Sequence, residues 1–460
     1  MAKRRLKVGD SILGMLVDGI DETPYVPATL TLTESGVRLD VSYIDVGSPN
    51  SSSGTRDWFD SRQVPTNLSL VSLDGDISLF GCESSGYRVN MVRGFGVGRI
   101  TPEALVFNFR DGEHNDDLGV TELRSTIDGL GEWTGYTGVE RTDSVNPSGR
   151  LDRVTIELAG VDGAEWDAGA ARMKVRAEPH TDKLHIEDAI VLSSSFAQPQ
   201  PVTEHLNEHR KVANLMSFIF GCPIFFRNHE IKDSRFTIRS LNGDIQDTPY
   251  VQLIHASTVK EYERPTPSQK QLLEPLLDIT SVGPTGLQQW SDAYDTWGRF
   301  IHPASSALNR PGALIENIVV NTSMSFEAAG NLIGKKVGEE LTYTKKGKPT
   351  TATYGYRCIA HTGLNFDALN VSQAGLARAI SDNYNTIKHF DRGEFPDATE
   401  THVIGEISIL ISRVLALKIA RPDIQLVGAL ERRLREIGEY LTRNRLSIRD
   451  DGTFSKPLGN

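Results

Sequence analysis

The residues best suited to chemistry lie in the segment Arg378–Gly393. If this segment is helical, Arg378, Asp382, Asn385 and His389 share one face, because they are spaced at i, i+4, i+7 and i+11. A stripe at this spacing is usually apolar, since it is the face that a helix buries. A polar stripe of these types suits acid–base chemistry on a phosphate ester. A solvated helix face or a hydrogen-bonded helix contact is the alternative.

His389 is the candidate acid–base residue, because imidazole has an unperturbed pKa of about 6.5 and can both accept and give a proton near neutrality. Lys388 and Arg392 are candidates for stabilising negative charge that develops on a phosphate. Asn383 or Asn385 is a candidate for orienting the imidazole or for holding the phosphate. By itself, this segment therefore predicts acid–base chemistry on a phosphate ester.

Three further groups complete the candidate site. Asp382 would raise the pKa of His389 if the two came close, which would favour the acid role. Tyr384 is a candidate for stacking on an unpaired base. Lys345 and Lys346 lie in a short basic loop that either contacts the phosphate backbone or is a solvated turn.

A different chemistry is suggested by His205, Glu208 and His209, which match the His-x-x-Glu-His pattern of inverted zincins. In that pattern two histidines one turn apart bind zinc beside a glutamate base. The surrounding residues are polar and charged, so an exposed first turn of a helix is the alternative. No third zinc ligand is evident downstream, so no metal site is expected.

The first two hundred residues predict β structure. Residues 28–33 and 37–43 alternate apolar and polar side chains on either side of a turn, which predicts a hairpin with one buried face. Residues 68–73 and 77–80 alternate around Asp74-Gly75, which is a strong hairpin signal. Many short antiparallel strands are typical of a sandwich or an open barrel. Further strands are expected at 104–109, 154–158, 173–177 and 190–192.

Helical patterns begin at Pro201 and dominate beyond Glu263–Lys270, a polar stretch with two prolines that is typical of a linker. An apolar seam of the kind a core helix buries follows the linker, formed by Trp290, Tyr294, Trp297 and Ile301. Further helices are expected at 313–336, 403–420 and 424–441. We therefore predict an α+β protein with a β-rich, sandwich-like N-terminal domain at 1–262, a helical domain at 268–449 and a flexible tail at 450–460.

The composition narrows the class of protein. A formal net charge of −11 over 460 residues argues against a general nucleic-acid coat protein, which needs a broad basic face. It leaves room for an enzyme that binds RNA in a local basic pocket. Cys82, Cys222 and Cys358 are scattered and fit a reducing cytoplasm. No stretch approaches the roughly 18 apolar residues of a membrane helix, so we expect a cytoplasmic protein without membrane contact.

Three segments together resemble a known family. They are the Leu73–Cys82 hairpin, the segment Leu123–Gly135 around Trp133, and the segment Tyr384–Gly393. Their content and order are similar to those of ApeA-type bacterial anti-phage proteins, in which an ApeA N-terminal domain is joined to a C-terminal HEPN domain. The resemblance covers most of the chain, and the segments around Trp133 and His389 carry most of its specificity.

The resemblance implies a helical HEPN-like bundle that forms a homodimer or a higher homo-oligomer and cleaves RNA without a metal or another cofactor. It also implies a defence role, with abortive infection through cleavage of host RNA such as tRNA. The β domain would regulate the nuclease or sense a phage-derived trigger.

One feature departs from the family pattern, in which an arginine precedes the histidine by four to six residues. The corresponding positions before His389 hold Asp382, Asn383 and Tyr384. Arg378 lies about 16 Å from His389 along a helix, because each residue adds about 1.5 Å. Either Lys388, Arg392 or an arginine of a partner subunit supplies the missing charge, or the domain is a non-cleaving relative. The alternative to a nuclease is thus a HEPN-like dimerisation or binding protein that senses a ligand or phage component.

Overall fold

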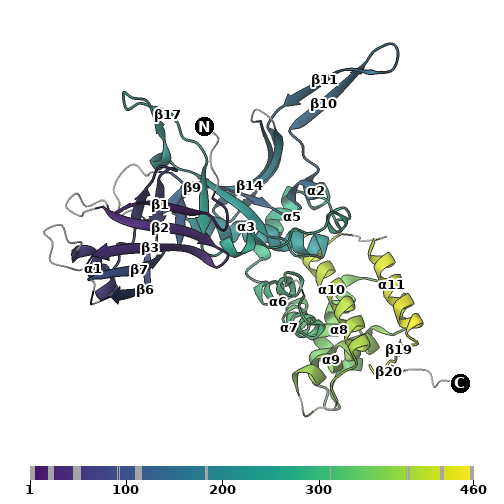
Figure 1. Cartoon of the computed structure of the whole chain (residues 1–460). Coiled ribbons are helices and arrows are strands. Elements are labelled where there is room, and N and C mark those ends of the chain that lie inside the picture. Colours follow the sequence, from purple (N-terminus) through teal and green to yellow (C-terminus); the bar gives the residue numbers. More distant parts are fainter. Residues whose placement is uncertain are drawn as a thin grey trace. The chain divides into compact units, whose positions relative to one another are not determined.

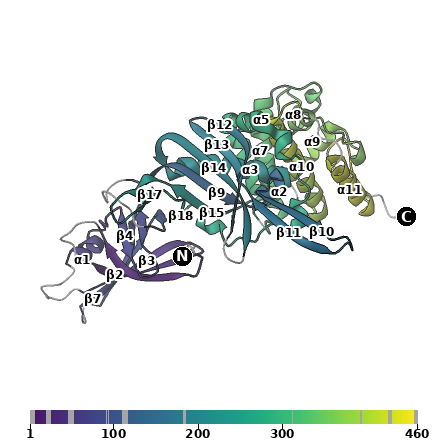
Figure 2. The same cartoon turned by 90° about the horizontal axis from the view of Figure 1, so that it is seen from above.

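A computed structural model describes residues 6–18, 25–44, 53–90, 92, 94–108, 117–181, 185–310, 312–389, 391, 394–424 and 429–455 of the chain. The chain forms two compact units. The sheet unit consists of Met1–Gly131, Gly135–His209 and Phe225–Thr266. The helical unit consists of Glu132–Thr134, Arg210–Ile224 and Pro267–Asn460. Figures 1 and 2 show the strands of the first in purple to teal and most helices of the second in green to yellow.

A single large antiparallel sheet dominates the sheet unit. Among the described residues, fourteen strands join in the order β12-β13-β14-β9-β15-β18-β8-β5-β4-β1-β2-β3-β7-β6. Their bounds are β1 Ser11–Val17, β2 Val26–Thr33, β3 Gly36–Ile44, β4 Leu68–Val71, β5 Ile77–Phe80, β6 Glu83–Asn90, β7 Phe95–Thr101, β8 Ala104–Val106, β9 Gly119–Ile127, β12 Val161–Ala168, β13 Ala171–Thr181, β14 Ile186–Pro201, β15 Phe226–Lys232 and β18 Val251–His255.

Both predicted hairpins are present. β2 pairs with β3 so that Leu30 lies opposite Leu39, and β4 pairs with β5 so that Leu68 lies opposite Leu79. These four side chains are buried in one apolar cluster, which is the burial that the alternating pattern predicts. The short helix α1 (Ser53–Asp60) contributes Trp58 and Phe59 to the same cluster.

The predicted α+β class is confirmed, since a large antiparallel sheet region precedes a helical region. Hydrogen bonding runs through one continuous sheet, although the strand pattern suggested a sandwich or an open barrel. A second apolar cluster lies under β8, β9, β15 and β18, where Val106, Leu123, Ile231 and Leu253 are fully buried.

Two small hairpins of the sheet unit lie outside the large sheet. β10 (Val139–Val145) pairs only with β11 (Leu151–Leu158), and β16 (Ile238–Arg239) pairs only with β17 (Ile245–Asp247), among the strands that the structure describes. The β10–β11 hairpin is the longer one and is drawn as a separate arm in Figure 1.

The helical unit contains the helices that the sequence predicted beyond the linker, with shifted ends. The segment Trp290–Ile301 is not one helix, because turns at Tyr294–Trp297 separate α5 from α6. Trp290, Tyr294 and Ile301 are nevertheless buried, so their predicted core role is confirmed. The helix bounds are α2 Leu130–Thr134, α3 Val202–Phe220, α4 Gln269–Leu272, α5 Ile279–Ala293, α6 Gly298–Leu308, α7 Ile315–Ile333, α8 Thr351–Thr362, α9 Gln373–Lys388, α10 Ala398–Ala420 and α11 Ala429–Arg443.

The end of the chain is more ordered than the predicted tail at 450–460. β19 (Ser447–Ile448) pairs with β20 (Phe454–Ser455). The backbone N–H of Ser372, at the start of α9, donates to a carboxylate oxygen of Asp450 at 3.3 Å. Residues 447–455 therefore form a small hairpin that is hydrogen-bonded to α9, and residues 456–460 lie outside the described residues.

Candidate functional site

The segment that carries the predicted stripe forms helix α9. Ser372 caps its start, because its hydroxyl accepts a hydrogen bond from the N–H of Gly375 at 3.1 Å. His389 caps its end, and its N–H donates to the carbonyl of Asn385 at 2.9 Å. The predicted helix is therefore present, and the predicted stop at Phe390–Gly393 lies largely outside the described residues.

The members of the stripe point to different surroundings. The guanidinium of Arg378 donates to the carbonyls of Leu341 and Asp450. These bonds attach α9 to the loop before α8 and to the C-terminal hairpin. Arg378 therefore has a structural role between these segments, and its guanidinium is hydrogen-bonded to two carbonyl oxygens.

The amides of α9 also serve helix contacts. Asn383 is 7% exposed and its Nδ2 donates to the hydroxyl of Thr401 on α10 at 3.3 Å. Asn385 donates from Nδ2 to Ser381 at 3.2 Å within the helix. Asp382 is exposed. Asn383 and Asn385 therefore occupy separate environments, whereas Asp382 lies close enough to Arg378 for the guanidinium to stabilise its carboxylate. Partial burial of the carboxyl group outweighs this effect and raises the pKa of Asp382.

Tyr384 and Lys388 do come together. They lie one turn apart on α9, and the Lys388 ammonium donates to the Tyr384 hydroxyl at 3.0 Å. The same ammonium lies 5.2 Å from the centre of the Tyr384 ring. The hydrogen bond to Tyr384 raises the pKa of Lys388, so this side chain stays cationic at physiological pH.

Tyr384 and Lys388 line an open groove of about 930 Å³ in the helical unit. The other walls come from α6, α7 and α8, so the groove lies where four helices meet. Its polar lining is Thr296, Arg299, His302, Glu327, Asn331, Tyr354, Tyr384 and Lys388.

The charges of this groove suit an anionic ligand. Arg299, His302 and Lys388 are exposed, and they face one carboxylate, that of Glu327, which accepts a hydrogen bond from Thr351 at 2.9 Å. Two permanent cations and one imidazole therefore share one space with the half-buried ring of Tyr354. This combination provides phosphate contacts, a proton-transfer group and aromatic surface in one place. Tyr384 is only 2% exposed, so the prediction that its ring stacks on an unpaired base is wrong.

The remaining predicted residues lie elsewhere. His389 is half-buried at the end of α9 and does not line the groove, although it directly follows Lys388. Lys345 and Lys346 are exposed turn residues, closed by a hydrogen bond from the N–H of Thr344 to the carbonyl of Lys348 at 2.9 Å. Arg392 lies outside the described residues.

Sequence reasoning missed the contribution of α6. Arg299 and His302 are three residues apart, which places them on one helix face opposite the buried Phe300 and Ile301. The i, i+3 spacing of Arg299 and His302 therefore indicates a polar face on this helix. The apolar residues of Trp290–Ile301 indicate only the opposite, buried face. No sequence pattern identifies Tyr354 as a groove residue, because its position in the groove depends on how α8 packs against α7.

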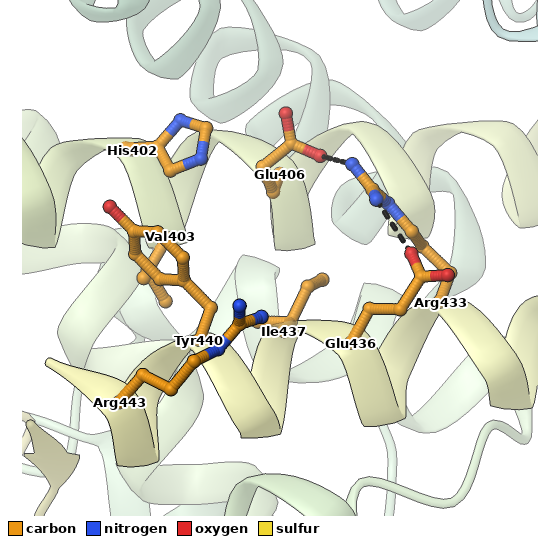
Figure 3. A pocket seen from close by; sticks show the side chains of 8 residues that line it. All are labelled: His402, Val403, Glu406, Arg433, Glu436, Ile437, Tyr440 and Arg443. Carbon is orange, nitrogen blue, oxygen red and sulfur yellow. Dashed lines mark hydrogen bonds and ion pairs between the residues drawn. The ribbon is translucent and has the colours of Figure 1, made fainter.

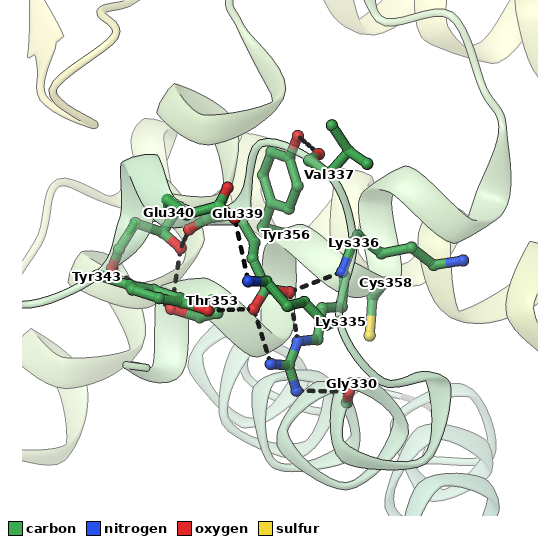
Figure 4. Close-up of polar contacts among 12 residues, drawn as sticks. Gly330, Lys335, Lys336, Val337, Glu339, Glu340, Tyr343, Thr353, Tyr356 and Cys358 are labelled. Atoms are coloured by element: carbon green, nitrogen blue, oxygen red, sulfur yellow. Dashed lines mark hydrogen bonds and ion pairs between the residues drawn. The ribbon is translucent and has the colours of Figure 1, made fainter. Parts of the chain in front are cut away.

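A buried ion pair fixes the helices behind Tyr354. The Arg357 guanidinium donates to both carboxylate oxygens of Glu339 at 2.7 and 2.9 Å and to the Gly330 carbonyl at 3.3 Å. Tyr343 donates to the same carboxylate at 2.5 Å. Figure 4 shows Glu339, Tyr343 and Gly330 of this cluster. The hydrogen bond from Arg357 lowers the pKa of Glu339 to about 2. Arg357 is therefore a structural cation and not a displaced member of the predicted site.

The zincin-like histidines are buried, not exposed, and their ring nitrogens are engaged. His205 makes hydrogen bonds to Ser194 at 2.7 Å and to the carbonyl of Val120 at 3.0 Å. His209 makes hydrogen bonds to Ser125 at 2.7 Å and to Ser194 at 2.9 Å. The exposed-turn interpretation is therefore wrong. The zinc interpretation is unsupported, because all four nitrogens already have polar partners and no cluster of three metal-ligating side chains occurs within the described residues.

A second pocket of about 240 Å³ lies between α10 and α11. Its lining includes His402 and Tyr440, whose rings are 5.3 Å apart and meet edge to face. Arg433 is paired with Glu406 and, at 2.8 Å, with Glu436 (Figure 3). The lining therefore holds two carboxylates against two arginines, Arg433 and Arg443, and both carboxylates pair with Arg433. The groove on α6–α9 has one carboxylate against two permanent cations and is better suited to a phosphate.

The fold and the groove together define an α+β protein of two units, with a large antiparallel sheet and a helical unit that carries a cationic, aromatic groove. The chain belongs to the ApeA N-terminal domain 1 family, whose model matches residues 18–288. This membership indicates a protein of anti-phage defence. Neither curated proteins nor solved structures gave a match. Among the described residues, no helix has the length and apolar character needed to cross a membrane.

Proposed function

We propose that this anti-phage defence protein is an RNA endonuclease whose helical unit is HEPN-like and cuts without a metal. The observation that carries the proposal is the groove, in which Arg299, His302 and Lys388 face one space beside the half-buried Tyr354. Single-stranded RNA is bound by this kind of surface, because cations contact its phosphates and aromatic rings stack on its bases.

The reaction is attack of a ribose 2′-hydroxyl on the adjacent phosphate. It needs a base for the hydroxyl proton, an acid for the leaving 5′-oxygen and a cation for the charge that develops on the phosphate. Lys388 and Arg299 are the candidates for contact with the phosphate, because both cations line the groove. Two imidazoles are candidates for the proton transfers: His302, which lines the groove, and His389, which follows Lys388 and is the residue that the sequence predicts.

Cleavage by purified protein in the presence of a chelator tests this proposal. We expect His302→Ala or His389→Ala to lower the rate of RNA cleavage by about 10²–10⁴, the usual contribution of a proton-transfer group. His402→Ala is the matched control, since His402 is exposed and lines the other pocket. Full cleavage and full phage protection by both His302→Ala and His389→Ala would overturn the nuclease proposal.

The substrate contact has its own test. Replacing Lys388 by Met removes one cation from the groove, and we expect RNA binding to weaken by about tenfold, equivalent to about 1.4 kcal/mol. The dependence of binding on salt should also fall by about 0.7 in logarithmic slope, as for one phosphate contact to a single strand. Lys345→Met and Lys346→Met change cations outside the groove, so they separate the groove from the basic loop predicted from the sequence.

A second function is favoured by one observation. The position where the family pattern needs an arginine holds Asp382, Asn383 or Tyr384, and the nearest upstream arginine, Arg378, is occupied by two carbonyls. On this proposal the helical unit is a HEPN-like dimerisation or binding module, and the sheet unit senses a ligand or phage component. Intact RNA after prolonged incubation, together with RNA binding or a partner-dependent change in oligomeric state, would favour it.

The finer assignments belong to the same proposal. Host RNA such as tRNA is the expected substrate, abortive infection the expected outcome, and a phage-derived trigger the expected ligand of the sheet unit. Self-association through the helical unit would add a second set of cations. Sequencing the RNA fragments from infected cells would identify which RNA is cut.

A further inference from the structure

The β10–β11 hairpin is incomplete as a sheet. Within the part of the chain that the structure describes, its two strands pair only with each other, and nearly every side chain on them is exposed. A two-stranded hairpin by itself is marginally stable in water, whereas three or more strands with an apolar face are stable. The arm drawn in Figure 1 therefore lacks the strands that would normally support it.

One face of this hairpin is apolar. The register sets Val139 opposite Leu158, Arg141 opposite Ile156 and Asp143 opposite Val154. Because side chains alternate along a strand, all of these lie on the same face. Leu158, Ile156 and Val154 are 37%, 44% and 41% exposed. A contiguous exposed apolar strip of this kind marks an interaction surface.

The free edge of β10 is complementary to itself. If a second copy pairs antiparallel about a two-fold axis at Thr142, then Arg141 lies opposite Asp143 of the partner subunit. Val139 lies opposite Val145 of the partner subunit by the same operation. Glu140 lies opposite Ser144 of the partner subunit. No like charges meet, and apolar side chains meet apolar ones, which is what a closed two-fold contact requires.

The charges at the centre of this contact would alternate in sign. Arg141 and Asp143 already form an ion pair along β10, with Nε and Oδ1 2.8 Å apart. A two-fold copy adds the same pair in the opposite direction, so each guanidinium then has two carboxylate neighbours. Each exposed pair contributes little by itself, but a network of four charges fixes the register of the two strands.

The other edge is a poorer match. The same operation on β11 about Thr155 sets Arg153 opposite Glu157 of the partner subunit and Val154 opposite Ile156 of the partner subunit, which match. It also sets Asp152 opposite Leu158 of the partner subunit, which places a carboxylate against an apolar side chain. The register of the hairpin is also irregular there, since Ser144 pairs with Arg153 and Val145 with Leu151, which leaves Asp152 unmatched. The structure therefore favours β10 as the pairing edge.

We infer that β10 is a dimerisation edge whose occupant is β10 of a second copy of this chain, giving a four-stranded sheet in the order β11-β10-β10-β11. Main-chain hydrogen bonds supply the contact. The apolar strips of the two hairpins lie on the same face of this sheet, on its outer strands, with the charges of the two β10 strands between them. This contact is independent of the nuclease proposal and of any dimer through the helical unit, because it uses only residues 139–158.

Cross-linking at the two-fold axis tests the geometry. Thr142→Cys places two thiols directly opposite each other, where Cβ atoms of a strand pair are about 4.5–5.5 Å apart, so mild oxidation or a short bis-maleimide should give a covalent dimer. The native cysteines Cys82, Cys222 and Cys358 are buried, which keeps the background low. Thr155→Cys is the matched control, because Thr155 lies opposite Thr142 within the hairpin. Cross-linking through Thr155→Cys but not Thr142→Cys would overturn the β10 edge.

Charge reversal tests the complementarity by light scattering of the full chain. Arg141→Asp sets four carboxylates together, and Asp143→Arg sets four cations together, so each single variant should weaken the dimer at least tenfold. The double variant Arg141→Asp with Asp143→Arg restores alternate signs and should restore the dimer. A monomeric parent chain at micromolar concentration, or a folded double variant that stays as monomeric as the single variants, would overturn the inference.

Discussion

The carbonyl of Val120 can only accept a hydrogen bond, so it fixes a proton on Nε2 of His205. Nδ1 of His205 must then accept from the hydroxyl of Ser194. The oxygen of Ser194 in turn accepts from Nε2 of His209, and Nδ1 of His209 accepts from Ser125. The carbonyl of Val120 therefore fixes the tautomers of both His205 and His209, which are buried and neutral. An additional proton on either ring would have no hydrogen-bond acceptor.

This buried chain predicts that the sheet unit is destabilised by mild acid. Burial lowers the pKa of His209 well below its ordinary value, and burial also lowers the pKa of His205. The unfolded chain takes up protons below about pH 6.5, while the folded chain does not. Stability is therefore complete above that pH and falls as the pH is lowered, by on the order of 1 kcal/mol for His209 at pH 5.5.

Denaturant unfolding of the full chain at pH 7.5 and pH 5.5, followed by a probe in the sheet unit, measures this effect. His209→Asn removes one imidazole and should reduce the difference between the two pH values, even though it lowers stability at both. An equal pH dependence in the parent chain and in this variant would contradict the assignment.

At the scale of elements, the Arg357–Glu339 ion pair attaches α8 to the segment that precedes it. Glu339 is fully buried and Arg357 nearly so, and breaking such a pair by removing one partner costs about 3–5 kcal/mol, because the other charge is left buried. We expect Glu339→Ala to lower the free energy of unfolding of the helical unit by this amount. Chemical denaturation measures the loss.

The matched control for that prediction is Glu340→Ala. Glu340 pairs with the exposed Lys335 at 3.3 Å, and solvent screens such a surface pair, so Glu340→Ala should cost much less stability than Glu339→Ala. Similar losses from Glu339→Ala and Glu340→Ala would show that the buried pair contributes no more than a surface pair.

How far the elements could be predicted depends on whether their signals are local. The hairpin at Asp74-Gly75 and a helix running from Arg378 to about His389 were predicted because turn residues and helical spacing lie within one segment. The break between α5 and α6 was missed, since the seam Trp290–Ile301 keeps helical spacing across it and stays buried on both sides. Strand β10 was missed because apolar and polar residues do not alternate along it. The equally exposed β11 was predicted at 154–158, where Val154, Ile156 and Leu158 alternate with polar residues.

The site was predicted only in part for the same reason. Tyr384 and Lys388 were identified from one helix, and they do share the groove. Arg299 and His302 come from α6, about ninety residues earlier, and only helix packing brings them to the same space. Arg378 has the residue type for a phosphate contact, yet its partners are carbonyls from two distant loops, which no spacing rule reveals.

At the scale of the whole molecule, helix α3 is divided between the units. Its second half belongs to the helical unit with Arg210–Ile224. The Trp290 indole donates to the carbonyl of Lys211 at 2.8 Å, and Arg413 donates to the carbonyls of Phe218 and Ile219 at 2.7 Å each. The helical unit is therefore incomplete if the chain is cut at the proline-rich linker.

This division predicts that a fragment of residues 267–460 does not fold stably alone. Its missing segment includes Phe218, which is fully buried and whose ring lies 6.3 Å from that of Trp290 and 6.2 Å from that of Phe300. Loss of one such aromatic side chain costs about 3–5 kcal/mol, a large part of the roughly 5–15 kcal/mol that stabilises a typical domain. We expect the fragment to be aggregated or non-cooperative in thermal unfolding. Co-expression with residues 1–266, which supply Arg210–Ile224, should recover a soluble complex, whereas cooperative unfolding of the lone fragment at the temperature of the full chain would contradict the prediction.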